Sequence, residues 1–94
     1  MQFEWDREKA EVNLKKHGIS FEEASSVWRD YFNIELFDHE HSVQENRFLM
    51  VGESNLNRLL IISFTERENK IRIISARELT PTERREYEHG HFEG

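Results

Sequence analysis

Arginines and a tyrosine gather in one short stretch of the chain, KIRIISARELTPTERREY, which runs from Lys70 to Tyr87. Guanidinium groups held at fixed positions bind phosphate or carboxylate, because each offers paired donors in a rigid plane. The stretch therefore predicts a site for an anionic ligand, with the candidate residues Arg72, Arg77, Arg84, Arg85 and Tyr87.

Arg72 and Arg77, the two arginines of the predicted strand, bind the same ligand only if they lie on the same face of that strand. Arg72 and Arg77 are five residues apart and lie on opposite faces of a regular strand, unless a bulge or the strand end reorients one of them. We favour Arg77 as the phosphate contact, because it comes just before a helix N-terminus whose free N–H groups also attract anions. For both residues, and for Arg47 in an earlier strand, the alternative is an ion pair with a carboxylate.

His17 is the candidate for proton transfer, because histidine is the side chain that ordinarily titrates near neutral pH. It ends a predicted helix, directly after Lys16. The alternative, which is compatible with catalysis, is that His17 only bonds to the last carbonyl groups of that helix. Lys16 is a candidate phosphate contact, with a solvated lysine at a helix end as its alternative.

The predicted last helix places Arg84 and Tyr87 on one face and Arg85 on another. Tyr87 is a candidate for stacking on a base or donating to a phosphate, and the alternative is that it packs the helix onto a sheet. Ser75 has no histidine and carboxylate at a spacing that would indicate a nucleophile, so we interpret it as a small strand residue.

Histidines also occur in the pairs His39-x-His41 and His89-x-His91. On a strand, a spacing of two residues would place both imidazole rings on one side, as in half of a metal site. Both pairs lie in acidic segments, however, and the chain has no cysteine. We predict no metal site and no cofactor.

The composition predicts one small, charged domain over residues 1–94, with residues 88–94 as a flexible tail. The absence of cysteine, of a signal-peptide pattern and of a long apolar run predicts a soluble, cytoplasmic protein. The net charge is −6, whereas general nucleic-acid binders carry an excess of basic residues. A basic patch on an acidic chain therefore favours a selective anion site.

Helix-capping signals delimit three helices. Asp6 predicts a helix from Arg7 to His17 that ends at Gly18, with Ala10, Leu14 and His17 on one face. Ser20 opens S-F-E-E, a capping box, and predicts a second helix ending near residue 30. Its apolar positions Phe21, Ala24, Val27 and Trp28 are expected to face the core. Thr80, Pro81 and Glu83 start the last helix in the same way.

The middle of the chain alternates in the manner of strands, over residues 32–38, 47–52, 59–65 and 71–77. Gln2 to Trp5 is either a short edge strand or an apolar lead-in. Short connections favour antiparallel pairing of consecutive strands. The prediction is an α+β domain: two N-terminal helices, a four-stranded antiparallel sheet and a C-terminal helix, with the helices on one face of the sheet.

Three blocks together resemble the BrnT family of type II toxins: FEWDREKAEVNLKKHGISFEEA at residues 3–24, R-x-x-x-x-G at residues 47–52, and RIISARELTPTERREY at residues 72–87. The resemblance implies a RelE-like fold and a metal-independent ribonuclease that inhibits translation. It also implies neutralisation by an antitoxin with a ribbon-helix-helix DNA-binding domain. Two toxin chains would join a dimeric antitoxin in a heterotetramer, which reaches operator DNA only through the antitoxin.

Two other functions remain open at this point. The negative charge and the lack of an evident acid–base pair fit a non-catalytic module that binds a partner. A degenerate toxin that still binds its antitoxin is the third possibility.

Overall fold

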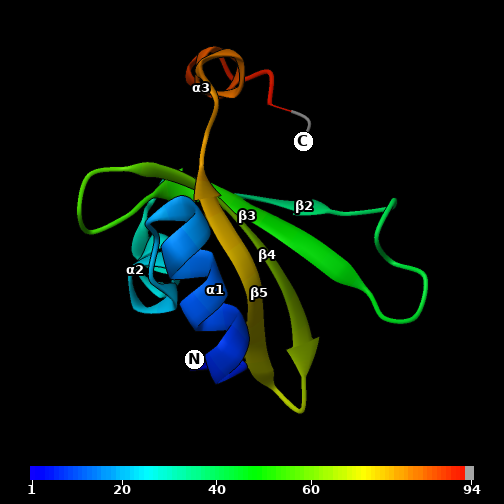
Figure 1. Cartoon of the computed structure of the whole chain (residues 1–94). Helices are drawn as coiled ribbons and strands as arrows, with labels where there is room; N and C mark the ends of the chain where they lie inside the picture. The colour runs from blue at the N-terminus through cyan, green and yellow to red at the C-terminus, as the bar shows by residue number, and fades with distance from the viewer. Residues whose placement is uncertain (93–94) are drawn as a thin grey trace.

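The computed structural model describes residues 1–92, and its elements follow one another as β1 (Gln2–Glu4), α1 (Arg7–His17), α2 (Phe21–Ser25), η1 (Ser26–Arg29), β2 (Ile34–Phe37), β3 (Arg47–Glu53), β4 (Leu59–Arg67), β5 (Lys70–Glu78) and α3 (Pro81–Glu88). Figure 1 shows α1 beside β5 and α3 beyond the end of the sheet. Within the described residues, no helix has the length and apolar character needed to cross a membrane.

The predicted helix ends are confirmed. The Asp6 side chain accepts from the N–H of Lys9 at 3.2 Å, and Gly18 takes the left-handed conformation at φ 72° that ends α1. Thr80 and Glu83 form the complete capping box of α3. The box at Ser20 is half formed, because the Glu23 carboxylate turns to other partners, and a 3₁₀ turn, η1, continues the short α2.

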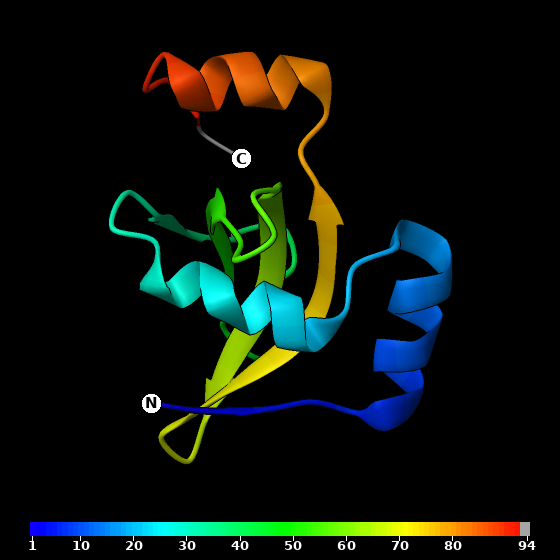
Figure 2. The ribbon, with the colours of Figure 1, turned by 90° about the vertical axis from the view of Figure 1, so that its left-hand side faces the viewer.

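The sheet has five strands in the order β1-β5-β4-β3-β2, and β1 pairs with β5 in parallel. The prediction of a four-stranded, purely antiparallel sheet was therefore wrong, although the four long strands do pair antiparallel as expected. The additional strand is the short edge strand that the sequence left open at Gln2 to Trp5. Three residues are too few to show the alternation that would have decided between a strand and an apolar lead-in. Figure 2 shows the N-terminal segment beside the start of β5.

A β-bulge interrupts the pairing of β4 with β5. Ser63 pairs with Ser75 and Phe64 pairs with Ile73, which leaves Ile74 as the extra residue. An extra residue reverses the alternation of the strand beyond it. In a regular strand, Arg72 and Arg77 would lie on opposite faces. Because of the bulge, they lie on the same face.

Apolar side chains fill both faces of the sheet. On one face, Phe21, Ala24 and Val27 of α2 and η1 are fully buried, as predicted, against a cluster that includes Ile62 and Phe64. Figure 2 shows α2 and η1 crossing this face. The second cluster consists of Val51, Ile61, Leu79 and Phe92, with Tyr87 of α3 packed on it.

The expectation that all helices cover one face was wrong, because consecutive apolar residues in the central strands need cover on both sides. Phe92 is only 7% exposed, and the final residues 93–94 lie outside the described part. How far the predicted tail of residues 88–94 is flexible stays a prediction.

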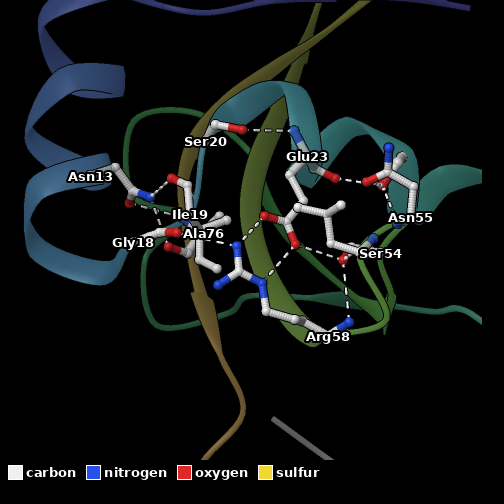
Figure 3. Close-up of polar contacts among 11 residues, drawn as sticks. Asn13, Gly18, Ile19, Ser20, Glu23, Ser54, Asn55, Arg58 and Ala76 are labelled. Atoms are coloured by element: carbon white, nitrogen blue, oxygen red, sulfur yellow. Dashed lines mark hydrogen bonds and ion pairs between the residues drawn. The ribbon is translucent and has the colours of Figure 1, made fainter.

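The buried face of α1 centres on a polar residue. Asn13 is 5% exposed, whereas Leu14, which was predicted to share one face with Ala10 and His17, is 51% exposed. The Asn13 amide donates to the carbonyls of Ile19 at 3.0 Å and Ala76 at 2.8 Å, and its oxygen accepts from the Ala76 N–H at 3.0 Å (Figure 3). Asn13 thereby occupies the free edge of β5 beyond the end of β1 and fixes α1 against the sheet.

A buried carboxylate ties α2 to the turn between β3 and β4 (Figure 3). Glu23 accepts from Ser54 Oγ at 2.6 Å and from Arg58 Nε at 3.0 Å, and a second contact joins its other oxygen to Arg58. Arg58 also donates to the Gly18 carbonyl at 3.2 Å. Hydrogen bonding to Arg58 is the main reason why the pKa of Glu23 lies below its ordinary value. This network holds the end of α1, where His17 lies.

Gly52, the glycine of R-x-x-x-x-G, lies where β3 meets η1. A Cβ atom at this position would come within 2.8 Å of Asp30 Oδ2 and 2.9 Å of Val27 Cγ1. The close approach of η1 to β3 therefore requires a residue without a side chain.

Candidate active site

Three parts of the chain meet around a cleft of about 470 Å³ on the sheet face that carries Arg77. The end of α1 contributes one wall, the loop between β2 and β3 another, and the middle of β4 and β5 the floor. The polar residues that line it include Lys16, His17, His41, Ser63, Ser75 and Arg77. A cleft with cationic and titratable side chains around small hydroxyl residues suits an anionic ligand that undergoes proton transfer.

Arg77 makes a bidentate ion pair with Glu83 of α3. The two nitrogen–oxygen distances are 2.7 Å and 2.9 Å, and the guanidinium also donates to the Glu78 carbonyl at 3.1 Å. The ion pair that was the alternative interpretation of Arg77 is thus present, and the same side chain lines the cleft. Glu83 fixes the guanidinium plane, which leaves the remaining donors of Arg77 available to a ligand.

Glu83 should make the protein sensitive to acid. Hydrogen bonding to Arg77 is the main reason why the pKa of Glu83 falls from 4.5 to about 2. Because the folded pKa is depressed, the pair stabilises the fold above about pH 4.5, and this contribution is lost as the pH falls toward 2. We expect the stability advantage of the wild type over Glu83→Gln to shrink by about 2 kcal/mol between pH 6 and pH 2, allowing for the partly exposed Arg77.

Urea unfolding at a series of pH values measures this difference. Glutamine retains the capping function at this position, so the comparison isolates the charge. Glu86→Gln, an exposed change on the same helix, is the control. Parallel pH dependence of stability in the wild type and Glu83→Gln would contradict the prediction.

Arg72 and Arg47 lie on the same sheet face as Arg77, one step away from the cleft. Thr65 of β4 pairs with Arg47 on one side and with Arg72 on the other. Thr65 is two residues, and therefore about 7 Å, beyond Ser63 along β4. Arg72 Nη1 lies 3.4 Å from Glu4 Oε2, and Arg47 Nε lies 3.6 Å from Glu45 Oε2. Arg47 Nε is buried and has no hydrogen bond within the described part of the chain. The bulge thus aligns three arginines along one face.

His17 and Lys16 enter the cleft from the end of α1, as neighbours of Ser75 and Arg77. His17 is partly buried and Lys16 is exposed. The predicted proton-transfer residue and the predicted phosphate contact are therefore brought together by tertiary structure, since His17 and Arg77 are far apart in the sequence.

The predicted site residues of α3 lie elsewhere. Arg84 and Arg85 are exposed, and Arg85 donates to Thr82 of its own helix at 3.4 Å. The Tyr87 hydroxyl donates to the Phe32 carbonyl at 3.1 Å, and burial raises the pKa of Tyr87. Tyr87 lines a different cleft, beside Leu59 and Glu53. The structure does not bring these three residues to His17 and Arg77.

The partnership of Asp38 with His41, which both line the cleft, was not predicted from the sequence. His41 Nδ1 lies 2.9 Å from Asp38 Oδ2. The signal was the spacing D-x-x-H in a polar loop, which was overlooked because the histidines were considered as a metal pair. His39 instead packs edge-on against Phe37, with ring centroids 4.6 Å apart. Over residues 1–92, no group of three or more His, Cys, Asp or Glu side chains is arranged to hold a metal ion.

Comparisons with known proteins agree with this architecture. The model of a family described as the ribonuclease toxin BrnT of type II toxin–antitoxin systems matches residues 5–83. The crystal structure of the Brucella abortus ribonuclease toxin BrnT superposes with a TM-score of 0.67. That match is 22% identical in sequence and covers 85% of this chain and 97% of the other, so it shows a shared fold. No curated protein sequence matches the chain.

Proposed function

Since the chain belongs to the BrnT family of ribonuclease toxins of type II toxin–antitoxin systems, we propose that it is an endoribonuclease that cuts RNA without a metal ion and thereby inhibits translation. The observation that carries the proposal is the bulge in β5. It places Arg72 and Arg77 on one face with Arg47, next to the cleft that His17 lines.

The chemistry requires three contributions from the protein. RNA is cut when its 2′-hydroxyl attacks the adjacent phosphate, so a base must remove a proton, a cation must stabilise the phosphorane, and an acid must protonate the leaving 5′-oxygen. We assign the cationic role to Arg77, because its guanidinium is held at the floor of the cleft. His17 takes part in proton transfer, and Lys16 contacts a phosphate at the cleft entrance.

Arg47 and Arg72 extend the site along the backbone of a bound strand. Their position one ladder step from Ser63 and Ser75 fits the phosphate next to the scissile one. Each of these arginines has a glutamate neighbour, as Arg77 has. Paired arginines on an acidic chain suit a selective site better than general attraction to nucleic acid. Substrate contacts by Arg84, Arg85 and Tyr87 stay predictions.

A type II system pairs its toxin with a protein antitoxin. We propose that the antitoxin of this chain carries a ribbon-helix-helix DNA-binding domain and that its dimer joins two toxin chains in a heterotetramer. Operator DNA is then bound through the antitoxin only, which is consistent with the net charge of −6 of the toxin chain.

Induction of the chain alone in a bacterial host is expected to arrest growth, and co-expression of the antitoxin is expected to restore it. The purified chain should cut RNA in the presence of EDTA and leave 2′,3′-cyclic phosphate and 5′-hydroxyl ends, as attack by the 2′-hydroxyl requires. Normal growth and intact RNA with folded protein would contradict the proposal and favour a degenerate toxin or a binding module. Cleavage that EDTA abolishes would contradict its metal independence.

A further inference from the structure

Two histidines line the cleft from different elements: His17 at the end of α1 and His41 in the loop between β2 and β3. We propose that His41, oriented by Asp38, is the general base of the site and that His17 is the general acid. This assignment rests on the proposed function and names the two proton-transfer groups that the reaction requires.

Asp38 is held firmly by the backbone around it. Its N–H donates to the Arg47 carbonyl at 2.8 Å, which continues the pairing of β2 with β3 by one residue. Its own carbonyl accepts from Ser42 Oγ at 2.5 Å. The Asp38 side chain is 14% exposed, whereas that of His41 is 60% exposed. A fixed, nearly buried carboxylate thus anchors an otherwise open imidazole.

The contact between the Asp38 carboxylate and the His41 imidazole favours one tautomer of the ring. The Asp38 carboxylate accepts from the backbone N–H of His41 at 3.3 Å and lies 2.9 Å from Nδ1. Because an ionised carboxylate only accepts hydrogen bonds, this contact places a proton on Nδ1, so that in the neutral ring Nε2 is the nitrogen with the free lone pair. Asp38 also stabilises the imidazolium that forms when Nε2 takes up a proton, as carboxylates do for histidine bases elsewhere.

The assigned step balances without any further reactant. His41 Nε2 removes the proton of the 2′-hydroxyl while O2′ forms a bond to phosphorus. The bond from phosphorus to O5′ breaks, and His17 donates a proton to O5′. The products are a 2′,3′-cyclic phosphate and a 5′-hydroxyl. Arg77, which lines the same cleft, stabilises the negative charge that develops on the phosphorane.

His41→Gln is expected to lower kcat/KM for RNA cleavage by about 10²- to 10⁴-fold. The pH profile should lose its acidic limb, because a base must be unprotonated to act. The charged and titratable groups that line the cleft with His41, and against which this profile is interpreted, are Lys16, His17, Asp38, Glu40 and Arg77. Asp38→Asn should displace the same limb and reduce the rate less, as expected for a positioning residue.

A substrate with sulfur in place of O5′ separates the two histidines. A thiolate leaves without protonation, because a thiol is far more acidic than an alcohol. This substrate should restore the cleavage rate of His17→Gln and leave His41→Gln slow. His39→Gln is the matched control, since His39 belongs to the same loop and packs on Phe37; its cleavage rate should equal that of the wild type.

Circular dichroism and thermal unfolding of the full-length variants establish that each is folded. If the wild type is active and a folded His41→Gln is equally active, the assignment alone is overturned. The same holds if the sulfur substrate restores the cleavage rate of His41→Gln and not that of His17→Gln. A wild-type chain that leaves RNA intact would overturn the proposed function and this assignment together.

Discussion

Arg77→Ala is expected to abolish growth arrest and to lower the RNA cleavage rate by about 10²- to 10³-fold, the range seen when one preorganised donor to a developing anion is removed. The reason is that Arg77 lies on the floor of the cleft with its guanidinium plane fixed by Glu83. Binding of the antitoxin should survive the change. Cleavage assays on purified protein, with antitoxin capture in parallel, measure both effects.

Two control variants separate chemistry from fold. Glu83→Gln removes the charge of the ion partner and keeps Arg77, so it should retain most of the cleavage activity. Arg29→Ala removes an exposed arginine of η1, on the opposite side of the sheet, and should leave activity unchanged. If Arg77→Ala loses antitoxin binding together with activity, Arg77 contributes to folding or to the antitoxin interface and not to catalysis.

Arg58→Ala should lower the free energy of unfolding by about 3 kcal/mol, because it leaves the Glu23 carboxylate buried without its cation. The side chain of Glu23 is 4% exposed and that of Arg58 32%, which keeps the expected loss at the lower end of the range for buried pairs. Urea unfolding at neutral pH measures the loss. The end of α1 should also loosen, since Arg58 holds the Gly18 carbonyl next to His17.

Arg67→Ala is the matched control for Arg58→Ala. Arg67 also pairs with a glutamate, Glu45, at 3.0 Å, but its side chain is 54% exposed. Water screens such a pair, so its removal should cost less than about 1 kcal/mol. Equal losses in the two variants would show that burial of Glu23 does not set the cost.

Several residues of the candidate site could be chosen from the sequence, but their arrangement around one cleft could not. His17, Lys16 and Arg77 were singled out by residue type and by their places at element ends, and the cleft contains all three. His41 was noticed only as half of a histidine pair, because no sequence pattern shows that the loop after β2 faces the end of α1. The three α3 residues were expected beside the site from sequence proximity to Arg77, yet the chain turns after β5 and carries them away.

Local signals were enough to locate the helices, the four long strands and the family. Capping residues such as Asp6, Gly18 and Thr80 act within four residues of their own position, so the sequence alone reveals where helices begin and end. Three features depended on partners far along the chain. The parallel strand β1 needed β5 beside it, Asn13 needed the backbone of Ala76, and the bulge at Ile74 needed the register of β4. Pairing over such separations is decided by the packing of the whole sheet, and it is this packing that puts Arg72 and Arg77 on one face.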